Sequence, residues 1–280
     1  MDRANRLARN YPVVVVDNTE RVTSGPALGL LPDIAYLANG ENLGIAAALN
    51  LGIAQCIARR MCSALLFDQD SEPSDALLLQ LPKLVAAQAA RGERVAVAGP
   101  AYDDVRLGGV APFVRFRYWK LERVRAEGKN PIDVDFLITS GSCVNLACWD
   151  EVGPMDESLY IDFVDVEWCV RARNKGYRVL GVPWLTLAHR LGEAPVRVLG
   201  RTYPMHSAAR HYYLSRNTVA LMLRREMPLT WKTTELVKMP VRLLIYALLP
   251  ANGGSHLKMA LKGFRDAIAG RMGRMREASH

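Results

Sequence analysis

Two carboxylates stand one residue apart directly after a hydrophobic run, in the sequence LLFDQDSEP at positions 65–73. Asp68 and Asp70 repel each other unless a cation lies between or beside them. Hard oxygen ligands suit Mg²⁺ or Mn²⁺, which keep several waters and bind through a few carboxylates together with the phosphates of a substrate. Because such a pair also occurs in ordinary surface turns, the metal site depends on two further observations. These are the buried strand before the pair and a second group of acids downstream.

The second group of acids lies in SLYIDFVDVEWCVRARNKGYRV, at positions 158–179. Asp162, Asp165 and Glu167 fall within six residues at the start of a helical pattern. Acids at a helix N-terminus are stabilised by the helix dipole, which is the structural alternative. Three acids within one short stretch exceed what capping requires, so we interpret them as part of a site.

Alternating strands and helices are predicted to position the first group of acids. The expected elements are a strand at 12–18, a short apolar stretch at 33–39, an amphipathic helix at 42–60, a strand at 63–70, a helix at 75–92 stopped by Gly92, and a strand at 94–100. This alternation predicts an α/β fold with a mainly parallel sheet covered on both faces. Ligands bind beyond the carboxyl ends of such strands, where Asp17, Asp68 and Asp70 are expected.

The composition is that of an ordinary globular protein, with 50% hydrophobic and 23% charged residues in a chain of 280. This length suffices for one large domain, or for one domain with an appendage. The five cysteines include no CxxC pair, which favours free thiols in a reducing compartment. Neither a hydrophobic leader nor a run of about 18 apolar residues is found, so we expect a cytoplasmic protein.

The net charge of +8 is concentrated near the C-terminus. Residues 224–280 contain 11 Lys or Arg against 4 Asp or Glu, a net charge of +7. Leu257, Leu261, Phe264 and Ile268 lie on one face of a helix predicted there. A basic amphipathic helix favours peripheral contact with an anionic membrane surface, and packing on the catalytic domain or on a dimer partner is the alternative. No recognised nucleic-acid motif accompanies the charge, so we expect no nucleic-acid partner.

Several stretches of the chain together carry a family resemblance. They are VVVVDNT, NLGIAAALNLGI, LLFDQDSEP, ITSGSCVNLACWDEVGPMDESLYIDFVDVEWCVRARNKGYRV, LAHRLGE and RHYYLSRN. With these stretches, in this order, the chain resembles family-2 glycosyltransferases of the glycosyltransferase-A (GT-A) fold. Within that family it is most similar to bacterial rhamnosyltransferases that build O-antigen or other surface polysaccharides. The resemblance implies a GT-A catalytic domain at 1–217 and a basic amphipathic helical extension at 218–280.

The resemblance also implies which residues bind the nucleotide-sugar donor. Asp17 would hydrogen-bond the pyrimidine base, while Asn42 and Gly44 in a loop, with Asn50 in the following helix, would flank the nucleotide. Another donor-binding group would be Asp68, Gln69 and Asp70, whose two carboxylates would hold Mg²⁺ or Mn²⁺ on the diphosphate, directly or through water. His189, in LAHRLGE, sits where related enzymes supply a further metal contact. A hydrogen-bonded histidine at a strand end is the alternative.

For the acceptor side, the resemblance implies a general base and a lining. Asp165 falls where the family places its base, and Asp162, Glu167 and Trp168 would line the acceptor. Ser140 and Gly141 would let the backbone approach it closely. The implied reaction is an inverting transfer of L-rhamnose from dTDP-L-rhamnose to a glycan or lipid-linked glycan, at the inner face of the cytoplasmic membrane.

The chain departs from the family in one respect, and the sequence leaves two alternative functions open. Family members open with an earlier strand ending in a Thr-Tyr-Asn-like motif, and this chain starts at about the helix that follows it. A phosphatase of the haloacid dehalogenase type also carries DxD after a strand, but needs Thr or Val where this chain has Glu72. A non-catalytic membrane scaffold would bind sugar nucleotide without turnover.

Overall fold

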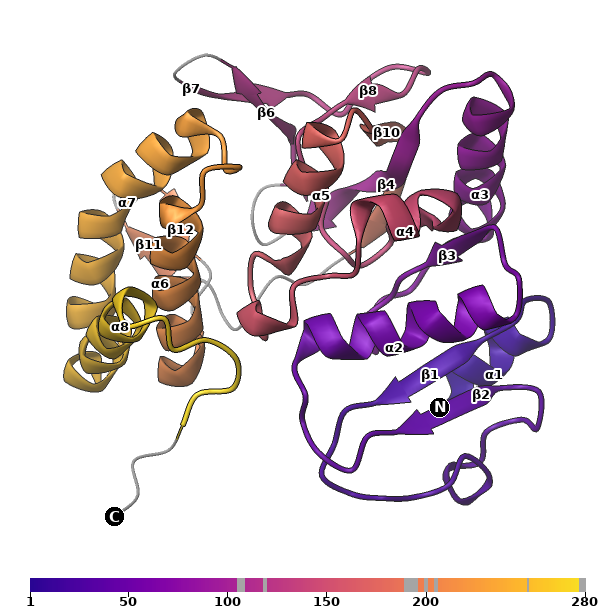
Figure 1. Cartoon of the computed structure of the whole chain (residues 1–280), viewed down its shortest axis with the longest axis horizontal. Coiled ribbons are helices and arrows are strands. Elements are labelled where there is room, and N and C mark those ends of the chain that lie inside the picture. Colours follow the sequence, from indigo (N-terminus) through magenta and orange to yellow (C-terminus); the bar gives the residue numbers. More distant parts are fainter. Residues whose placement is uncertain are drawn as a thin grey trace.

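The computed structural model describes residues 1–104, 109–117, 120–188, 196–198, 201–203, 206–250 and 252–276. Strands alternate with helices at first, and three long helices come last (Figure 1). The helices are α1 (Asp2–Ala8), α2 (Ile45–Ala58), α3 (Asp75–Ala90), α4 (Trp149–Val152), α5 (Val164–Asn174), α6 (Ala208–Leu223), α7 (Leu229–Leu248) and α8 (Gly253–Ile268). The strands are β1 (Val14–Asp17), β2 (Ala35–Ala38), β3 (Ser63–Leu65), β4 (Val95–Asp104), β5 (Gly109–Val110), β6 (Phe113–Arg117), β7 (Lys120–Val124), β8 (Ile132–Asp133), β9 (Cys143–Asn145), β10 (Arg178–Ala188), β11 (Val196–Val198) and β12 (Arg201–Tyr203).

The central sheet is mixed, which corrects the expectation of a mainly parallel sheet. Its strand order is β3-β9-β4-β10-β8, with β5 beside β4. Within the described part of this sheet only β4 and β10 run parallel, and β1 and β2 form a separate parallel pair. In the middle of the sheet β9 runs antiparallel to both β3 and β4, and β8 and β5 are antiparallel to β10 and β4. A strand of three residues is too short to show a period in the sequence.

Hydrophobic packing covers both faces of this sheet. Val144 and Val179 pack on the α5 side with Trp168, whereas their strand neighbours Cys143 and Leu180 pack with the side chains of α3. Successive strand residues point to opposite faces, so the two clusters are the two covered faces. The predicted covering of the sheet by helices is therefore confirmed, and the site acids lie at the edge of a well-packed core.

The predicted helices and strands hold, with one shortened strand. The helix predicted at 75–92 is α3, which Ser74 caps by accepting from the Leu77 N–H (3.3 Å), and Gly92 follows it with φ +80°. The strand predicted at 63–70 ends at Leu65, because the chain leaves the sheet before the acidic pair. Asp68 and Asp70 therefore lie in a loop and not in the strand itself.

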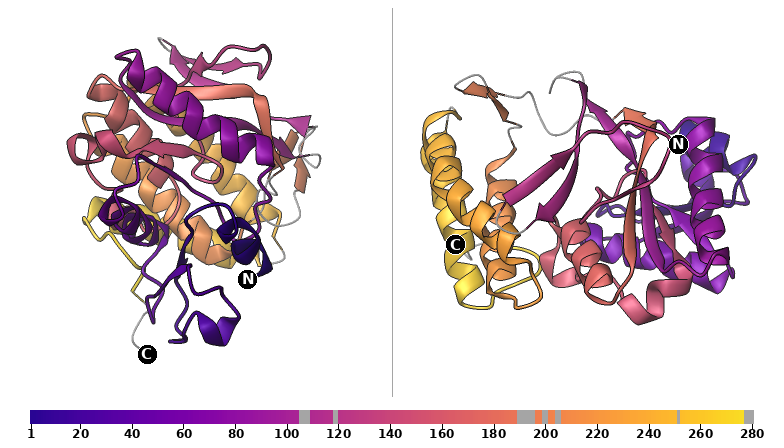
Figure 2. Two further views of the ribbon diagram at one scale, coloured as in Figure 1. Left: turned by 90° about the vertical axis from the view of Figure 1, so that its right-hand side faces the viewer. Right: turned by 90° about the horizontal axis from the view of Figure 1, so that it is seen from above.

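The C-terminal helices α6, α7 and α8 form a bundle beside α5 (Figures 1 and 2). The domain boundary expected between residues 217 and 218 falls inside α6. Helix α8 packs on α6, where the Tyr212 hydroxyl donates to the Asp266 carboxylate (3.0 Å). The stretch YYLSRN, at which the predicted catalytic domain ends, forms the middle of a helix that continues into the bundle.

A histidine pair at the α6–α8 contact predicts acid sensitivity. His211 is fully buried, its ring stacks on Tyr246 (centroids 3.6 Å apart), and its Nδ1 lies 2.9 Å from Nδ1 of His256. Burial, together with the nearby positive charge of His256, His206 and Arg210, lowers the pKa of His211 to about 3.

An unfolded histidine takes up its proton near pH 6.5, whereas His211 in the folded protein does not. The contribution of His211 to the free energy of unfolding is therefore fully present above pH 6.5. It is lost as the pH falls toward 3. Two pH units below 6.5 correspond to about 3 kcal/mol. We expect His211→Asn to lose less unfolding free energy than the wild type between pH 7.5 and 4.5, measured by urea titration. An equal loss in both proteins would contradict this expectation.

Candidate active site

The loop 66–71 keeps the acidic pair close to the segment before β9. The Leu66 N–H donates to the Ser142 carbonyl (2.9 Å), and the Gly141 N–H donates to the Leu66 carbonyl (2.6 Å). Beyond this point Asp68 is partly buried and Asp70 is exposed. The pair thus lies at the end of β3, as predicted, with the Asp70 carboxylate accessible to a cation.

Buried hydroxyl groups fix the loop from below. The Asp68 N–H donates to Ser140 Oγ (3.3 Å), which lies 2.5 Å from Ser71 Oγ. Both serines are almost completely buried. On the outer side, Arg3 of α1 donates to the Gln69 carbonyl, so the backbone of this residue is also held. The loop geometry is therefore set by the protein before any ligand binds.

Asp165 lies in the first turn of α5, on the other side of the 138–142 segment. Its Oδ2 accepts from the Thr139 N–H (3.3 Å) and its Oδ1 from the Val166 N–H (2.8 Å). Removal from water, helped by the charge of Asp162, raises the pKa of Asp165 to about 6 against the lowering effect of the backbone hydrogen bonds. A carboxylate with a pKa near 6 is mostly ionised at pH 7 and is a stronger base than an exposed aspartate.

Asp162 forms an ion pair with Arg210 of α6. Arg210 Nε and Nη2 lie 3.1 and 3.0 Å from Asp162 Oδ1. Burial nevertheless outweighs the arginine and raises the pKa of Asp162. The charge of Asp162 also raises the pKa of Asp165. By pairing with Asp162, Arg210 partly offsets the negative charge that acts on Asp165. Arg210 lies in the RHYYLSRN stretch, where no local pattern predicts its pairing with Asp162.

The two groups of acids meet across residues 138–142. Thr139 contacts Asp165, and the next residue, Ser140, contacts Asp68. The buried Tyr102 hydroxyl supports this segment through the carbonyls of Ile138 (2.9 Å) and Ser140. Burial raises the pKa of Tyr102 most, and the charges of both Asp165 and Asp68 raise it as well. The structure thus brings the two predicted carboxylate groups to one edge of the sheet.

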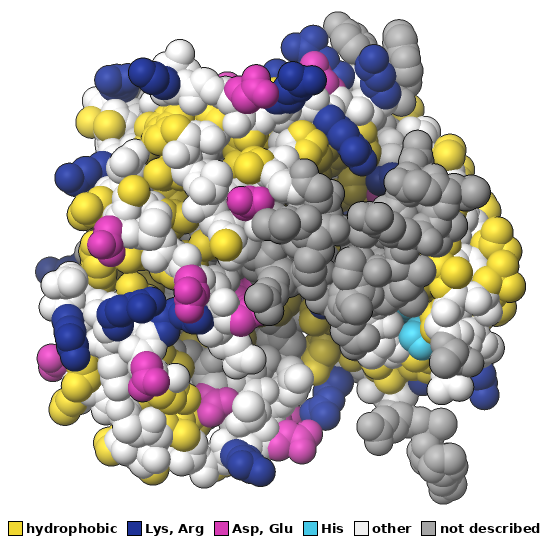
Figure 3. All heavy atoms as spheres, turned by 180° about the vertical axis from the view of Figure 1, so that it is seen from behind, with side chains coloured by type: hydrophobic (Ala, Val, Ile, Leu, Met, Phe, Trp, Pro, Cys, Tyr) yellow, Lys and Arg dark blue, Asp and Glu magenta, His cyan; other side chains and the backbone are white. Residues whose placement is uncertain are grey.

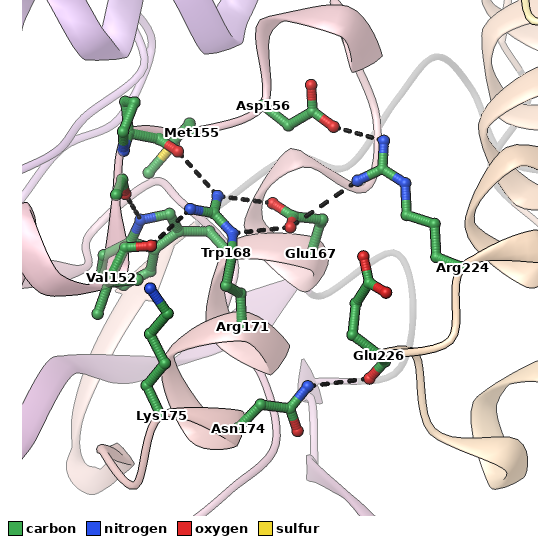
Figure 4. Close-up of polar contacts among 12 residues, drawn as sticks. Val152, Met155, Asp156, Glu167, Trp168, Arg171, Asn174, Lys175, Arg224 and Glu226 are labelled. Atoms are coloured by element: carbon green, nitrogen blue, oxygen red, sulfur yellow. Dashed lines mark hydrogen bonds and ion pairs between the residues drawn. The ribbon is translucent and has the colours of Figure 1, made fainter.

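Glu167 and Trp168 turn into the interior instead of lining this edge (Figure 4). Glu167 forms a two-pronged ion pair with Arg171 (2.8 and 2.9 Å), and a longer contact with Arg224 (3.9 Å). The indole N–H of Trp168 donates to the Gly153 carbonyl (2.9 Å). Both side chains are buried, so their acceptor-binding assignment has no support in their position. The third acid is explained by an internal ion pair across one helical turn.

On the nucleotide side, Asp17 lies at the end of β1. Its Oδ2 accepts from the Tyr36 hydroxyl (2.5 Å) and its Oδ1 from the Thr19 N–H (3.0 Å). These hydrogen bonds, the one from Tyr36 first, lower the pKa of Asp17 against a smaller effect of burial. Asn42 Oδ1 accepts from Asn18 Nδ2 (3.1 Å), which connects the two loops after β1 and β2. Asn18 is a further organising residue that the sequence patterns did not single out.

Packing explains three of the predicted site residues. Gly44 has φ +87°, and a Cβ there would lie 2.5 Å from the Tyr160 ring. Gly141 has φ +80°, and its Cβ would lie 2.7 Å from Leu187. Asn50 bridges α2 to Met155, donating to its carbonyl and accepting from its N–H, both at 2.9 Å. A β-carbon would collide with the protein itself at both glycines, whether or not a ligand approaches.

A divalent cation fits the acidic pair only with help from a substrate. No group of three His, Cys, Asp or Glu side chains in the described ranges could hold a metal ion alone. Asp68 and Asp70 supply hard oxygen ligands at an accessible edge, which matches the few-carboxylate binding of Mg²⁺ and Mn²⁺. His189 lies outside the described residues, so its predicted metal contact stays a prediction.

No helix in the described part of the chain is long and apolar enough to cross a membrane.

Comparison with known proteins places the chain in a family. No family model matches the chain. The dTDP-rhamnosyl transferase RfbF of Shigella flexneri is 30% identical over 264 residues, which cover 94% of this chain and 88% of that protein.

Two solved structures share the fold at low sequence identity. The structure of GalNAc-T7 with UDP, GalNAc and Mn²⁺ has a TM-score of 0.50 and 14% identity, and covers 86% of this chain but only 53% of its own. Residues 1–349 of S. aureus TarS match with a TM-score of 0.51 and 14% identity, over 94% of this chain and 73% of that one. The similarity to RfbF extends along nearly the whole chain and the fold matches these structures, so the chain belongs to the GT-A glycosyltransferase family that includes this dTDP-rhamnosyl transferase.

Proposed function

We propose that this glycosyltransferase moves L-rhamnose from dTDP-L-rhamnose to a glycan or lipid-linked glycan, with inversion at the anomeric carbon. The similarity to RfbF supports the donor. The observation that carries the mechanism is the meeting of Asp68 and Asp165 across Thr139 and Ser140. One edge then offers carboxylates for a cation on the leaving group and, beyond them, a carboxylate for the attacking hydroxyl.

In this proposal the chain's own residues divide the work. Asp68 and Asp70 would hold Mg²⁺ or Mn²⁺, which stabilises negative charge on the departing diphosphate. Asp165, held by two backbone N–H groups and with a pKa of about 6, accepts the proton of the acceptor hydroxyl. Asp17, Asn42 and Gly44 flank the nucleotide, and Asp162 faces the acceptor, with Arg210 limiting its charge.

A thermal-shift comparison of nucleotide sugars tests the donor. Ligand that binds only the native state raises apparent stability, so dTDP-L-rhamnose with Mn²⁺ should raise the melting temperature most. The panel includes UDP-N-acetylgalactosamine and dTDP-glucose, each with Mn²⁺ and with chelator. A larger shift with a different donor would replace rhamnose in the proposal, and shifts that ignore the chelator would remove the metal.

We also propose that the C-terminal bundle rests on the membrane that carries the acceptor. Val237, Val241, Leu244 and Leu248 recur on one face of α7 and are 50 to 75% exposed. Hydrophobic side chains gather on the side of the molecule that the C-terminal helices form (Figure 3). With a net charge of +7 in residues 224–280, this face suits an anionic lipid surface.

Vesicle sedimentation checks the membrane contact. The protein should co-sediment with phosphatidylglycerol-containing vesicles at low salt, and less at high salt because exposed charges are screened. The double variant Val237→Gln/Leu244→Gln should lose this binding. Leu79→Gln, on the exposed side of α3, is the matched control and should retain it. Equal sedimentation of all three proteins, or none at low salt, would remove the membrane from the proposal.

A further inference from the structure

The loop between η4 (Glu157–Leu159) and α5 has an unusual backbone. Tyr160, Asp162 and Phe163 all have positive φ angles, of 65°, 66° and 63°. None of them is glycine, and β-carbons make this conformation unfavourable, so such residues persist only where the surroundings hold them. The loop carries Asp162, and Phe163 opens α5 by accepting from the Glu167 N–H (2.9 Å). Its shape therefore sets where Asp165, in the first turn of α5, is presented.

Two adjacent and fully buried residues of α6 hold this loop by its carbonyl groups. Arg216 Nη2 donates to the carbonyls of Leu159 (2.9 Å) and Ser158 (3.2 Å). Asn217 Nδ2 lies 2.9, 2.7 and 3.0 Å from the carbonyls of Leu159, Ile161 and Asp162. Arg216 Nε donates to Asn217 Oδ1 (3.0 Å), which turns the amide so that its N–H groups face the loop.

The segment after α8 completes the arrangement. The Gly273 N–H donates to the Ser158 carbonyl (2.7 Å), and the Gly273 carbonyl accepts from Arg216 Nη1 (2.5 Å). The Met275 N–H donates to the Tyr213 hydroxyl (2.8 Å), and the Tyr213 ring stacks on Tyr160 (centroids 4.9 Å apart). A segment more than 100 residues away in sequence thus closes on the loop that precedes α5.

We propose that Arg216 and Asn217, with the backbone of Gly273, form a positioning clamp for glycosyl transfer: they hold the 158–163 loop in its strained shape and thereby place Asp162 and Asp165 toward the acceptor. The inference rests on the proposed function, because it takes these carboxylates as the acceptor side. The clamp gives the C-terminal region a part in catalysis that is independent of membrane contact. Within the described structure, the hydrogen bonds of Arg216 and Asn217 do not reach the loop 66–71 that carries Asp68 and Asp70.

The test uses the full chain and two variants. Asn217→Ala removes both N–H donors of the side-chain amide, and Asn217→Ser leaves one hydroxyl donor in their place. Asn174→Ala is the control, because the exposed Asn174 also donates its Nδ2 to a backbone carbonyl (Glu226, 3.0 Å) but at the other end of α5. We expect kcat to fall by about 10- to 100-fold in the Asn217 variants, since small displacements of reacting groups have effects of this size. The thermal shift caused by dTDP-L-rhamnose and Mn²⁺ should persist, and the rising limb of the kcat–pH profile should move from its wild-type position. Asn174→Ala should match the wild type in all three.

Each outcome decides the proposal. Wild-type kcat in both Asn217 variants overturns it. The proposal is also overturned if kcat falls only in proportion to the fraction of folded protein, while the rising limb of the kcat–pH profile stays at its wild-type position. If Asn217→Ala does not fold, Asn217→Ser carries the same comparison, and its failure to fold as well would make the pair structural and overturn the positioning role. If the wild type neither binds nor uses dTDP-L-rhamnose, the proposed function has failed instead. The clamp is then measured by the hydrogen exchange of residues 158–163, which Asn217→Ser must accelerate and Asn174→Ala must not.

Discussion

Asp165→Asn is expected to lower turnover by roughly 10²- to 10⁴-fold, the usual size of general-base catalysis. Asparagine keeps the shape of the side chain, and its single carbonyl oxygen can accept from one of the two N–H groups of Thr139 and Val166, but it cannot take the proton of the acceptor hydroxyl. Because the loss occurs in the transition state, kcat should fall while the affinity for dTDP-L-rhamnose stays near that of the wild type.

The pH dependence gives a second view of the same residue. A general base works when it is ionised, so wild-type activity should rise with pH through the pKa of Asp165, near 6. This rising limb should be absent from the residual activity of Asp165→Asn. Asp162→Asn is the neighbouring control, because it removes a carboxylate paired with Arg210 and should retain the limb at a lower pH. Near-normal turnover in Asp165→Asn, with collapse in Asp162→Asn, would move the base to Asp162.

The double variant Asp68→Asn/Asp70→Asn should weaken metal-dependent donor binding by more than about 100-fold. Even groups that only orient metal ligands are worth 10- to 100-fold in metal affinity, so losing both carboxylates should exceed that. The fold should survive, because the pair lies in a loop beyond β3 whose backbone is held by Ser140 and Arg3.

Calorimetric titration of the donor with and without Mn²⁺ measures this effect. Asp75→Asn is the control, an acid in the first turn of α3 a few residues beyond the pair. Its donor affinity should equal that of the wild type. Equal affinity of the wild type and the double variant, or wild-type affinity that chelator leaves unchanged, would exclude a metal held by this pair.

Local patterns predicted the elements that position the donor side. The β-branched run before Asp17 and the cap and stop of α3 depend on neighbours within a few residues, and all of them appear where the patterns put them. The acidic pair could be placed for the same reason, since a strand that ends in charges must end at the sheet's edge. The strand predicted at 63–70 was too long. Leu66 still pairs with Ser142, but the chain turns away from the sheet at this point.

Long-range contacts account for what the patterns did not show. The pairing of Glu167 with Arg171 lies within one helical turn, but its contact with Arg224, more than 50 residues later in the chain, could not be read from the local sequence. Likewise β9 is too short to carry a period, so its antiparallel insertion into the sheet could not be read locally. The roles of Arg216 and Asn217 follow only from carbonyl groups that lie more than 50 residues earlier in the chain.

Transfer of radiolabelled rhamnose tests the central claim most directly. The purified full chain is incubated with labelled dTDP-L-rhamnose, Mn²⁺ and membranes that carry the glycan acceptor, and label is counted in the lipid and polysaccharide fractions. The wild type should incorporate label, chelator should prevent it, and Asp165→Asn should reduce its rate by at least about 100-fold. Incorporation from a different nucleotide sugar but not from dTDP-L-rhamnose, or equal rates for the wild type and Asp165→Asn, would contradict the account.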